Sequence, residues 1–255
     1  MIKVGLIGHG QTGQSVAKVL RDDPRFELCW VAKRHAEQPA HSKQTSGPAN
    51  PSAPIVSLTT ALSSSWLDAN PVDGLIDFSA PQAIHAYGSI ARERGMAIVS
   101  AISAYGQDDL TWARELAKDT RVLCSANITM GINFMIVAAR LLRLIAPNAD
   151  VEIVEQHFRD KPEVSGTARK LAASLALDEA HITSLRLGGI VGHHEVIFGF
   201  PYQTVRIAHD SIRREAFGTG AAFAMSELMQ KPAGFYSFEE LLMQRLQDEM
   251  LFQAR

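Results

Sequence analysis

A glycine-rich turn near the N-terminus constrains this chain more than any other feature. Gly8, Gly10 and Gly13 form a G-x-G-x-x-G pattern directly after the apolar run 2–7. Residues 11–21 then follow the spacing of an amphipathic helix. The first glycine permits a tight turn, the second lets the backbone approach a pyrophosphate, and the third lets helix and strand pack closely. The pattern therefore predicts a strand–turn–helix unit that binds a dinucleotide at the helix N-terminus.

Strand and helix signals alternate along the rest of the first half. Strands separated by helices imply right-handed crossovers and a mainly parallel sheet. The segment from Ala36 to Pro54 is rich in Pro, Ser, Ala and Gln, which predicts an exposed loop. The predicted strands are 26–32, 55–58, 74–78, 97–101 and 121–126, and the predicted helices are 81–94 and 108–118.

The second half has a different pattern, because three predicted strands follow one another closely, which favours an antiparallel or mixed sheet. The predicted strands are 151–157, 182–187, 195–200 and 204–208, and the predicted helices are 133–145, 167–175, 216–230 and 238–251. We therefore predict an α/β fold with an N-terminal Rossmann dinucleotide-binding domain formed by 1–127 and 214–255. The inserted segment, 128–213, is predicted to be an α+β domain for substrate binding and oligomerisation.

Charge and composition exclude several classes of function. The chain has 25 Lys and Arg against 27 Asp and Glu, and no block of like charge predicts a nucleic-acid or membrane partner. No apolar run reaches membrane-spanning length and no leader precedes the first strand, so we expect a cytoplasmic protein. Cys29 and Cys124 lie far apart in apolar runs, which predicts buried thiols rather than a disulfide or a metal site.

The end of the second predicted strand indicates which cofactor is bound. An acidic residue there would bind the ribose hydroxyls of NADH, but this chain has Lys33 and Arg34. Two cations suit the 2′-phosphate of NADPH, so we predict NADPH with NADH possible; a solvated basic turn is the alternative. Phe78 follows a parallel strand, where ligands bind, and Asn127 is a candidate contact of the nicotinamide amide. A helix cap near Phe78 and a turn cap at Asn127 are the structural alternatives.

A polar segment in the second half carries candidate catalytic groups. His157 ends a predicted strand, Lys161 follows in a loop, and Ser165, Gly166 and Thr167 begin a predicted helix. A hydroxyl and unpaired N–H groups at a helix start can bind a carboxylate, and a lysine and a histidine can hold an anion and move a proton. From the residues alone, a capped turn with exposed charges remains equally consistent with this segment.

The same segment carries a resemblance to a known family. Residues 152–168, EIVEQHFRDKPEVSGTA, resemble the active-site signature of dihydrodipicolinate reductases, E-x-H-H-x-x-K followed by P-S-G-T-A. Further similar segments occur in the family's order: 74–81, 125–133, 190–196 and 209–221. The resemblance implies a nicotinamide-dependent reductase of a cyclic unsaturated imine dicarboxylate, and we expect a homo-oligomer, either a tetramer or a dimer.

Residue roles follow from the resemblance. It implies that His157 and Lys161 are catalytic, and that an arginine, Arg213 or its neighbour Arg214, reaches the substrate. Ser100 begins the segment 100–103, which lies where the family has a turn near the nicotinamide. The resemblance also implies a carboxylate site built by Ser165, Gly166 and Thr167. The complete set of predicted cofactor contacts is Gly8, Gly10, Gln11, Thr12, Gly13, Lys33, Arg34, Phe78, Ser100 and Asn127.

Four departures from the family pattern bear on the substrate. Phe158 replaces the second histidine, Val164 replaces the proline before Ser165 in a loop one residue shorter, and 100–103 reads Ser-Ala-Ile-Ser instead of Gly-Thr-Thr-Gly. The connection that leads to Gly192 is also shorter. These changes make the site more apolar, which favours a related reductase with a less polar substrate, or a non-catalytic member.

Two other classes of function stay open at this level. One is a Rossmann oxidoreductase acting on an amino acid or a sugar acid, against which the retained His157 and Lys161 argue. The other is an NADPH-binding protein without turnover. His193 and His194, with His181 and His209, match no zinc signature, so we predict no metal.

Overall fold

The computed structural model describes residues 1–34 and 53–253, and the chain divides into two compact units. The first unit comprises Met1–Thr129 and Phe217–Arg255, and the second comprises Met130–Ala216. The predicted insert, 128–213, overlaps the second unit. A side chain at Gly220 would collide with the carbonyl oxygen of Ile128, so these two segments of the first unit pack backbone against backbone.

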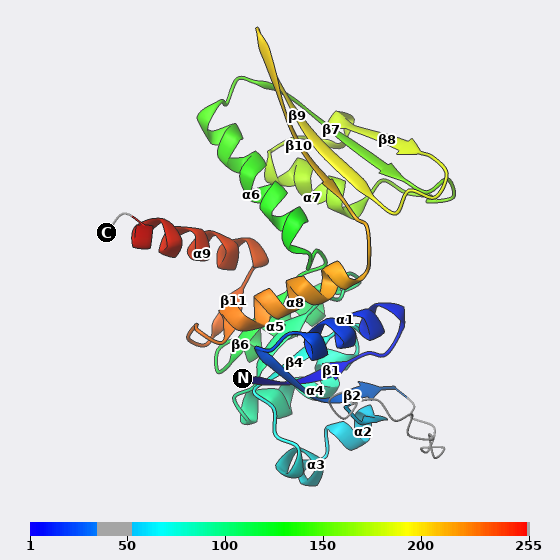
Figure 1. The fold of residues 1–255 in the computed structure, drawn as a ribbon, viewed down its shortest axis with the longest axis vertical. Helices are drawn as coiled ribbons and strands as arrows, with labels where there is room; N and C mark the ends of the chain where they lie inside the picture. Colours follow the sequence, from blue (N-terminus) through cyan, green and yellow to red (C-terminus); the bar gives the residue numbers. More distant parts are fainter. Residues whose placement is uncertain (35–52, 254–255) are drawn as a thin grey trace. The chain divides into compact units, whose positions relative to one another are not determined.

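The first unit is built on a seven-stranded sheet in which every neighbouring pair of strands is parallel. The strand order, β11-β6-β5-β4-β1-β2-β3, places β1 between β4 and β2, where the direction of winding reverses (Figure 1). Ligands of such sheets bind at the carboxyl ends of the strands beside this reversal. The strands are β1 (Ile2–Ile7), β2 (Phe26–Lys33), β3 (Ile55–Ser57), β4 (Gly74–Asp77), β5 (Ala97–Ser100), β6 (Arg121–Cys124) and β11 (Gly234–Tyr236).

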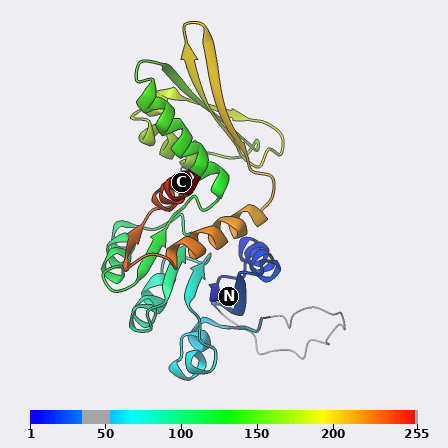
Figure 2. The ribbon, with the colours of Figure 1, turned by 60° about the vertical axis from the view of Figure 1, so that its left-hand side comes forward.

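Helices cover both faces of this sheet, so the central strands consist of almost unbroken apolar residues (Figures 1 and 2). One face packs against α1 (Gln11–Asp22), α8 (Glu215–Leu228) and α9 (Phe238–Gln253). The other face packs against the remaining helices of the unit. These are α2 (Leu58–Ala61), α3 (Ser64–Ala69), α4 (Ala83–Glu93) and α5 (Gln107–Leu116).

The second unit contains a mixed four-stranded sheet of order β10-β9-β7-β8. Strands β7 and β8 are parallel, whereas β7–β9 and β9–β10 are antiparallel. Two helices pack on one face of this sheet and bury Ile153, Val196 and Phe198. The elements are α6 (Met130–Ile145), β7 (Asp150–His157), α7 (Gly166–Ser174), a 3-10 turn (Glu179–His181), β8 (Ile182–Arg186), β9 (His193–Phe200) and β10 (Gln203–Asp210).

Several local predictions were wrong at short elements. Leu58, predicted to end a strand, begins α2, because the Ser57 hydroxyl caps that helix by accepting the Thr60 amide at 3.0 Å. Helix α3 and the three-residue strand β11 were missed, and α6 begins three residues before the predicted Asn133. Elements as short as α2, α3 and β11 contain too few residues for a periodic pattern to show.

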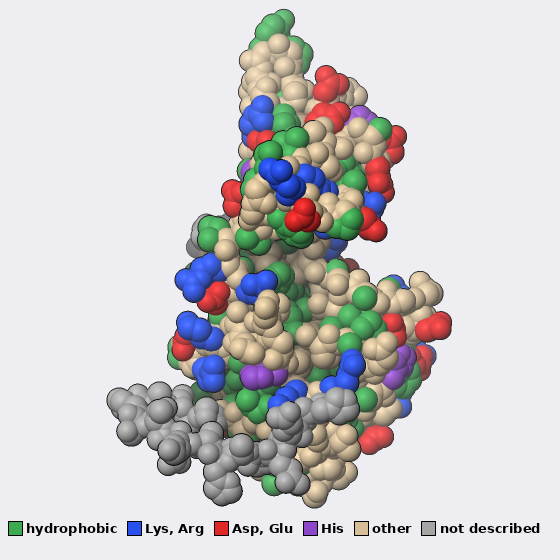
Figure 3. All heavy atoms as spheres, turned by 90° about the vertical axis from the view of Figure 1, so that its right-hand side faces the viewer, with side chains coloured by type: hydrophobic (Ala, Val, Ile, Leu, Met, Phe, Trp, Pro, Cys, Tyr) green, Lys and Arg blue, Asp and Glu red, His purple; other side chains and the backbone are tan. Residues whose placement is uncertain are grey.

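The remaining predictions of this kind concern the loop 36–54, the two thiols, the surface charge and membrane-spanning helices. Residues 35–52, most of the predicted loop 36–54, lie outside the described residues. Cys29 and Cys124 are free and only half-buried, because each side chain lies at the edge of a packed helix–sheet layer. On the face in Figure 3, the described acidic and basic side chains are interspersed and form no continuous field of one charge. Among the described residues, no helix has the length and apolarity needed to cross a membrane.

Candidate active site

A cavity of about 550 Å³ lies at the carboxyl ends of β1, β2 and β4, in the first unit. Its wall contains the glycine-rich turn and both cations that follow β2. No carboxylate side chain belongs to this wall within the described part of the chain. The lining residues are Ile7, Gly8, His9, Gly10, Ala32, Lys33, Arg34, Leu58, Phe78, Ser79, Ala80, Gln82, Ala83 and Ala86.

Geometry requires glycine at two of the three glycine positions of the turn, Gly8 and Gly13. Gly8 has a φ of +104°, and a Cβ there would lie 2.7 Å from the carbonyl oxygen of Phe78. A Cβ on Gly13 would lie 2.1 Å from the carbonyl oxygen of Gly8, so only glycine lets α1 pack this closely on the turn. A Cβ on Gly10 would meet nothing within 4 Å, so the backbone at the start of α1 is open to a ligand.

The structure brings five of the ten predicted cofactor residues to this cavity: Gly8, Gly10, Lys33, Arg34 and Phe78. The other five are not part of its wall. Gln11, Thr12 and Gly13 form the first turn of α1, and Asn127 lies in the turn after β6. Ser100 is fully buried, and its hydroxyl lies 2.7 Å from the Tyr105 hydroxyl.

A buried carboxyl group supports one edge of the cavity. Asp77, at the end of β4, accepts hydrogen bonds from the amide and the hydroxyl of Ser79, at 2.9 and 2.6 Å, and from the Tyr87 hydroxyl at 3.0 Å. Burial raises the pKa of Asp77 to about 6, although these hydrogen bonds oppose the increase. Since Ser79 lines the cavity, Asp77 fixes the turn that forms part of its wall.

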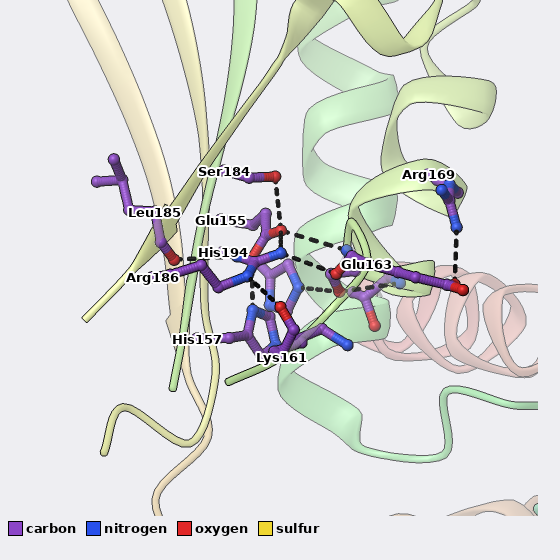
Figure 4. Close-up of polar contacts among 11 residues, drawn as sticks. Glu155, His157, Lys161, Glu163, Arg169, Ser184, Leu185, Arg186 and His194 are labelled. Atoms are coloured by element: carbon purple, nitrogen blue, oxygen red, sulfur yellow. Dashed lines mark hydrogen bonds and ion pairs between the residues drawn. The ribbon is translucent and has the colours of Figure 1, made fainter. Parts of the chain in front are cut away.

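The second unit contains a buried polar cluster around Glu155 of β7 (Figure 4). The Arg186 guanidinium donates two hydrogen bonds to the Glu155 carboxylate, at 2.8 and 3.0 Å, and the Ser184 hydroxyl donates another at 2.7 Å. The Ser165 amide and the His157 ring complete the set of partners. Burial favours the neutral carboxyl, but these hydrogen bonds outweigh it and lower the pKa of Glu155 to about 2.

The same arginine also holds the loop between β7 and α7. The Arg186 side chain donates to the carbonyl oxygens of Lys161 and Glu163, at 3.0 and 2.8 Å. The Glu155–Arg186 pair therefore joins β7, β8, the Lys161 loop and the start of α7 through charge-assisted hydrogen bonds. These contacts fix the backbone of the predicted catalytic loop independently of its exposed side chains.

His157 is held in one orientation at the end of β7. Its Nδ1 atom bonds the Glu155 carboxylate. Its Nε2 atom lies 3.2 Å from the position that a Cβ of Gly192 would occupy, so a larger residue there would crowd the ring. A carboxylate on Nδ1 favours a proton at that nitrogen and leaves Nε2 as the atom that faces a ligand.

A second histidine packs against the first. The ring of His194, on β9, makes an edge contact with His157 at 5.3 Å between centroids. His194 Nε2 lies 2.8 Å from the Ser165 hydroxyl. Burial, reinforced by the nearby His157, lowers the pKa of His194 to about 3, so this ring is neutral at physiological pH.

The start of α7 differs in detail from the predicted carboxylate site. Ser165 caps the helix: its hydroxyl accepts the Thr167 amide at 3.2 Å, and its own amide donates to Glu155. The Ser165 and Thr167 amides are thus used within the protein. Gly166 is exposed, and a Cβ there would meet nothing within 4 Å, so its amide is open to an anion at a helix N-terminus.

Two predicted cations of this unit differ in their surroundings. No described carboxylate lies within ion-pair distance of the Lys161 ammonium, which is part-exposed at the edge of the cluster (Figure 4). Arg213 is 72% exposed and pairs with Glu215 at 2.8 Å, so it takes no part in the described contacts of the Glu155 cluster. Its predicted contact with substrate stays a prediction.

Sequence reasoning placed Glu155 in the candidate segment without a role, and it did not place His194 or Arg186 in the site. The alternation of β9 could have placed His194, because Val196 and Phe198 face the core and His194 shares their side of the strand. No comparable signal marks Arg186, whose partners lie up to 31 residues away in sequence. Within the described residues, the histidines and carboxylates form no group that could hold a metal ion.

The Glu155 cluster makes acid stability testable. Because the folded pKa is about 2 and the unfolded value near 4.5, the stabilisation is complete above the unfolded value and is lost as pH falls through the folded one. We expect wild type to lose about 1–2 kcal/mol more of its unfolding free energy than Glu155→Gln between pH 5 and pH 3. Urea titrations at both pH values measure this difference.

A control for this experiment lies on the same strand. Glu152 is 53% exposed on β7 and its carboxylate pairs with His181 at 3.1 Å, so Glu152→Gln should have the acid sensitivity of wild type. If Glu155→Gln and wild type lose equal stability between the two pH values, the pKa of Glu155 is not lowered in the folded protein.

Two family models cover almost the whole chain. The model "Dihydrodipicolinate reductase, N-terminus" matches residues 2–128, and "Dihydrodipicolinate reductase, C-terminus" matches residues 128–242. The 4-hydroxy-tetrahydrodipicolinate reductase of Caldanaerobacter subterraneus subsp. tengcongensis is 28% identical over 95% of this chain and 98% of its own. That of Thermosipho africanus is 32% identical over 66% of this chain and 77% of its own.

Solved structures agree at the level of the fold. The dipicolinate-bound dihydrodipicolinate reductase of Paenisporosarcina sp. TG-14 superposes with a TM-score of 0.75, at 24% identity over 93% of this chain and 97% of its own. The DAP dehydrogenase of C. glutamicum has a TM-score of 0.60 at 11% identity, over 94% and 93% of the two chains. The chain belongs to the dihydrodipicolinate reductase family and is an NAD(P)H-dependent reductase.

Proposed function

We propose that this chain reduces a cyclic imine or enamine carboxylate and uses NADPH in preference to NADH. The observation that carries the proposal is the Glu155–His157 pair beside Lys161 and the N-terminus of α7. This arrangement combines a proton-carrying group with a site for an anion. The relatives named 4-hydroxy-tetrahydrodipicolinate reductase act on a substrate of this class.

The two histidines have different roles in this proposal. NAD(P)H, when bound, supplies a hydride to the unsaturated ring. The proton that completes the reduction comes from His157 Nε2, because the Glu155 carboxylate holds Nδ1 and orients the ring. His194, whose pKa is about 3, is neutral and serves to hold Ser165 and the ring of His157 in place.

The carboxylate of the substrate is bound at the start of α7. The Gly166 amide, the positive end of the helix and the Lys161 ammonium together attract an anion. Ser165 supports this site by capping the helix, and Thr167 lies in its first turn. A contact between Arg213 and the substrate would require its guanidinium to leave Glu215.

Phe158 indicates that the substrate is less charged than the family's dicarboxylate. Its side chain is 44% exposed at the start of the Lys161 loop, where the family has a second histidine. An aromatic ring there neither donates a hydrogen bond nor carries charge. A panel of cyclic imine carboxylates, followed by loss of NADPH absorbance, tests this activity; no turnover with any member while NADPH binds would contradict it.

The choice of NADPH rests on Lys33 and Arg34 in the cavity wall. Replacing both residues with alanine removes the cations for the 2′-phosphate and leaves the pyrophosphate turn intact. We expect NADPH affinity to fall roughly 10- to 100-fold, with NADH affinity almost unchanged. Calorimetric titration of both cofactors measures the two affinities. Equal wild-type affinities for NADH and NADPH would overturn the preference.

We also propose that the chain forms a homo-oligomer, a dimer or a tetramer, in the cytoplasm, where an NADPH-dependent reductase finds its cofactor. Within the second unit, α6 and α7 cover one face of the sheet, and the opposite face has no helix over it. Val154 and Ile197 lie on that uncovered face beside the Glu195–Arg206 ion pair. Light scattering coupled to size-exclusion chromatography measures the oligomeric state.

A further inference from the structure

One titratable side chain of the cofactor cavity has no role in the proposals above. His9 lies between Gly8 and Gly10, and this half-buried residue lines the same wall as Lys33 and Arg34. Its carbonyl oxygen accepts a hydrogen bond from the Gln14 side chain at 3.3 Å, which ties the turn to the first turns of α1. The ring is therefore placed where a phosphate group of the cofactor would be bound.

Among the described residues, the charged side chains that line the cavity with His9 or shift its pKa are all positive. Lys33 and Arg34 share its cavity, Arg21 acts on it from α1, and the wall contains no carboxylate. Burial, followed by repulsion from Lys33 and Arg21, lowers the pKa of His9 below its ordinary value. In the protein alone, His9 is thus mostly neutral at physiological pH.

We propose that His9 is a proton-switched third cation for the 2′-phosphate, so that binding of NADPH, but not of NADH, takes up a proton at this ring. The inference rests on the proposed preference for NADPH. A phosphate monoester carries close to two negative charges at neutral pH, which Lys33 and Arg34 neutralise in part. Its field replaces the repulsion at His9 by attraction, so the imidazolium form becomes favourable.

Thermodynamic linkage turns this coupling into a pH dependence of cofactor choice. If NADPH binding takes up a proton, its affinity rises as pH falls, at most tenfold per pH unit for one proton. Two other groups titrate nearby. Asp77 beneath Ser79 has a pKa of about 6, and the 2′-phosphate has its second pKa near about 6. Measurements between pH 7.0 and 8.5 keep both groups mainly ionised.

The direction of proton exchange on binding distinguishes protonation of His9 from ionisation of the 2′-phosphate. Cations around the 2′-phosphate favour its fully ionised form, so the phosphate can only release protons on binding. Calorimetric titration at pH 7.5 in two phosphate-free buffers of different ionisation enthalpy measures the net exchange. We expect net uptake with NADPH and none with NADH in wild type. In His9→Gln we expect no uptake, and in His9→Arg strong NADPH binding, also without uptake.

The affinity ratio provides a second measurement on the same variants. From pH 8.5 to pH 7.0 the preference of wild type for NADPH over NADH should grow about fivefold. In His9→Gln and His9→Arg it should change by less than about twofold, because neither residue titrates in this range. His9→Arg has a positive charge that does not titrate in this range, whereas His9→Gln has none. Comparing the two variants therefore distinguishes the effect of the charge from the effect of its pH dependence.

The outcomes distinguish this inference from the proposal on which it rests. Wild type that binds both cofactors equally at every pH contradicts the NADPH preference itself. A constant preference for NADPH without proton uptake overturns the role of His9 alone. Equal uptake with NADPH and NADH also overturns it, because the ring would then respond to the pyrophosphate, which both cofactors share.

Discussion

Lys161→Ala is expected to lower kcat/KM for the preferred imine about a hundredfold or more, while leaving cofactor affinity unchanged. The ammonium has no described carboxylate partner, so its charge is available to the substrate. The backbone of Lys161 is held separately, through its carbonyl oxygen by Arg186 and through its amide by Phe158. Removing the side chain therefore leaves the loop in place, and the melting temperature should stay within a few degrees of wild type.

The neighbouring Asp160 offers a matched control for this variant. It is exposed in the same loop, so Asp160→Asn removes a charge without removing a proposed substrate contact. Steady-state kinetics and thermal melts of both variants separate a local structural effect from a chemical one. Near-normal activity of Lys161→Ala would exclude the role proposed for the ammonium.

Phe158→His is expected to raise kcat/KM for a dicarboxylate cyclic imine roughly 10- to 100-fold relative to a monocarboxylate one. A histidine at this position adds a hydrogen-bond donor for a second carboxylate, and such a contact contributes about 1–3 kcal/mol. Because the Phe158 side chain is 44% exposed, its replacement leaves no cavity in the core. The fold should therefore tolerate the change.

Specificity constants for both substrates, in wild type and variant, measure this effect. Phe252→His is a matched control, since it replaces another exposed phenylalanine, 76% exposed near the end of α9. If wild type already reduces the dicarboxylate efficiently and prefers it, Phe158 does not set specificity. The loop would then be a tolerated variation in an enzyme with the substrate of its relatives.

Both variants act through residues that the sequence places in the site. The segments that resemble the family, from the glycine turn to the S-G-T triplet, occur in the family's order. This order predicted the family, and the two family models confirmed it. The α/β class and the mixed second sheet were also confirmed, because long elements repeat their apolar pattern often enough to be recognised.

The site itself was only partly predictable. The glycine turn and the cations after β2 line one cavity, since strand–turn–helix geometry is local, and their contacts with the cofactor stay a prediction. His9 was overlooked, because a variable position of the glycine motif carries no signal for a polar role. The carboxylate site at the start of α7 stays a prediction, and the structure adds that the Ser165 and Thr167 amides donate to the Glu155 carboxylate and the Ser165 hydroxyl.

Two local features of this protein follow from its sequence: a glycine turn suited to a dinucleotide, and a loop that presents Lys161 before a capped helix. The side chains that surround these features depend on the tertiary structure. Glu155, Arg186 and His194 come from three strands, and only the pairing of β7 with β8 and β9 brings them together. Sheet register joins residues that are distant in sequence, and burial then keeps the His194 ring neutral at physiological pH.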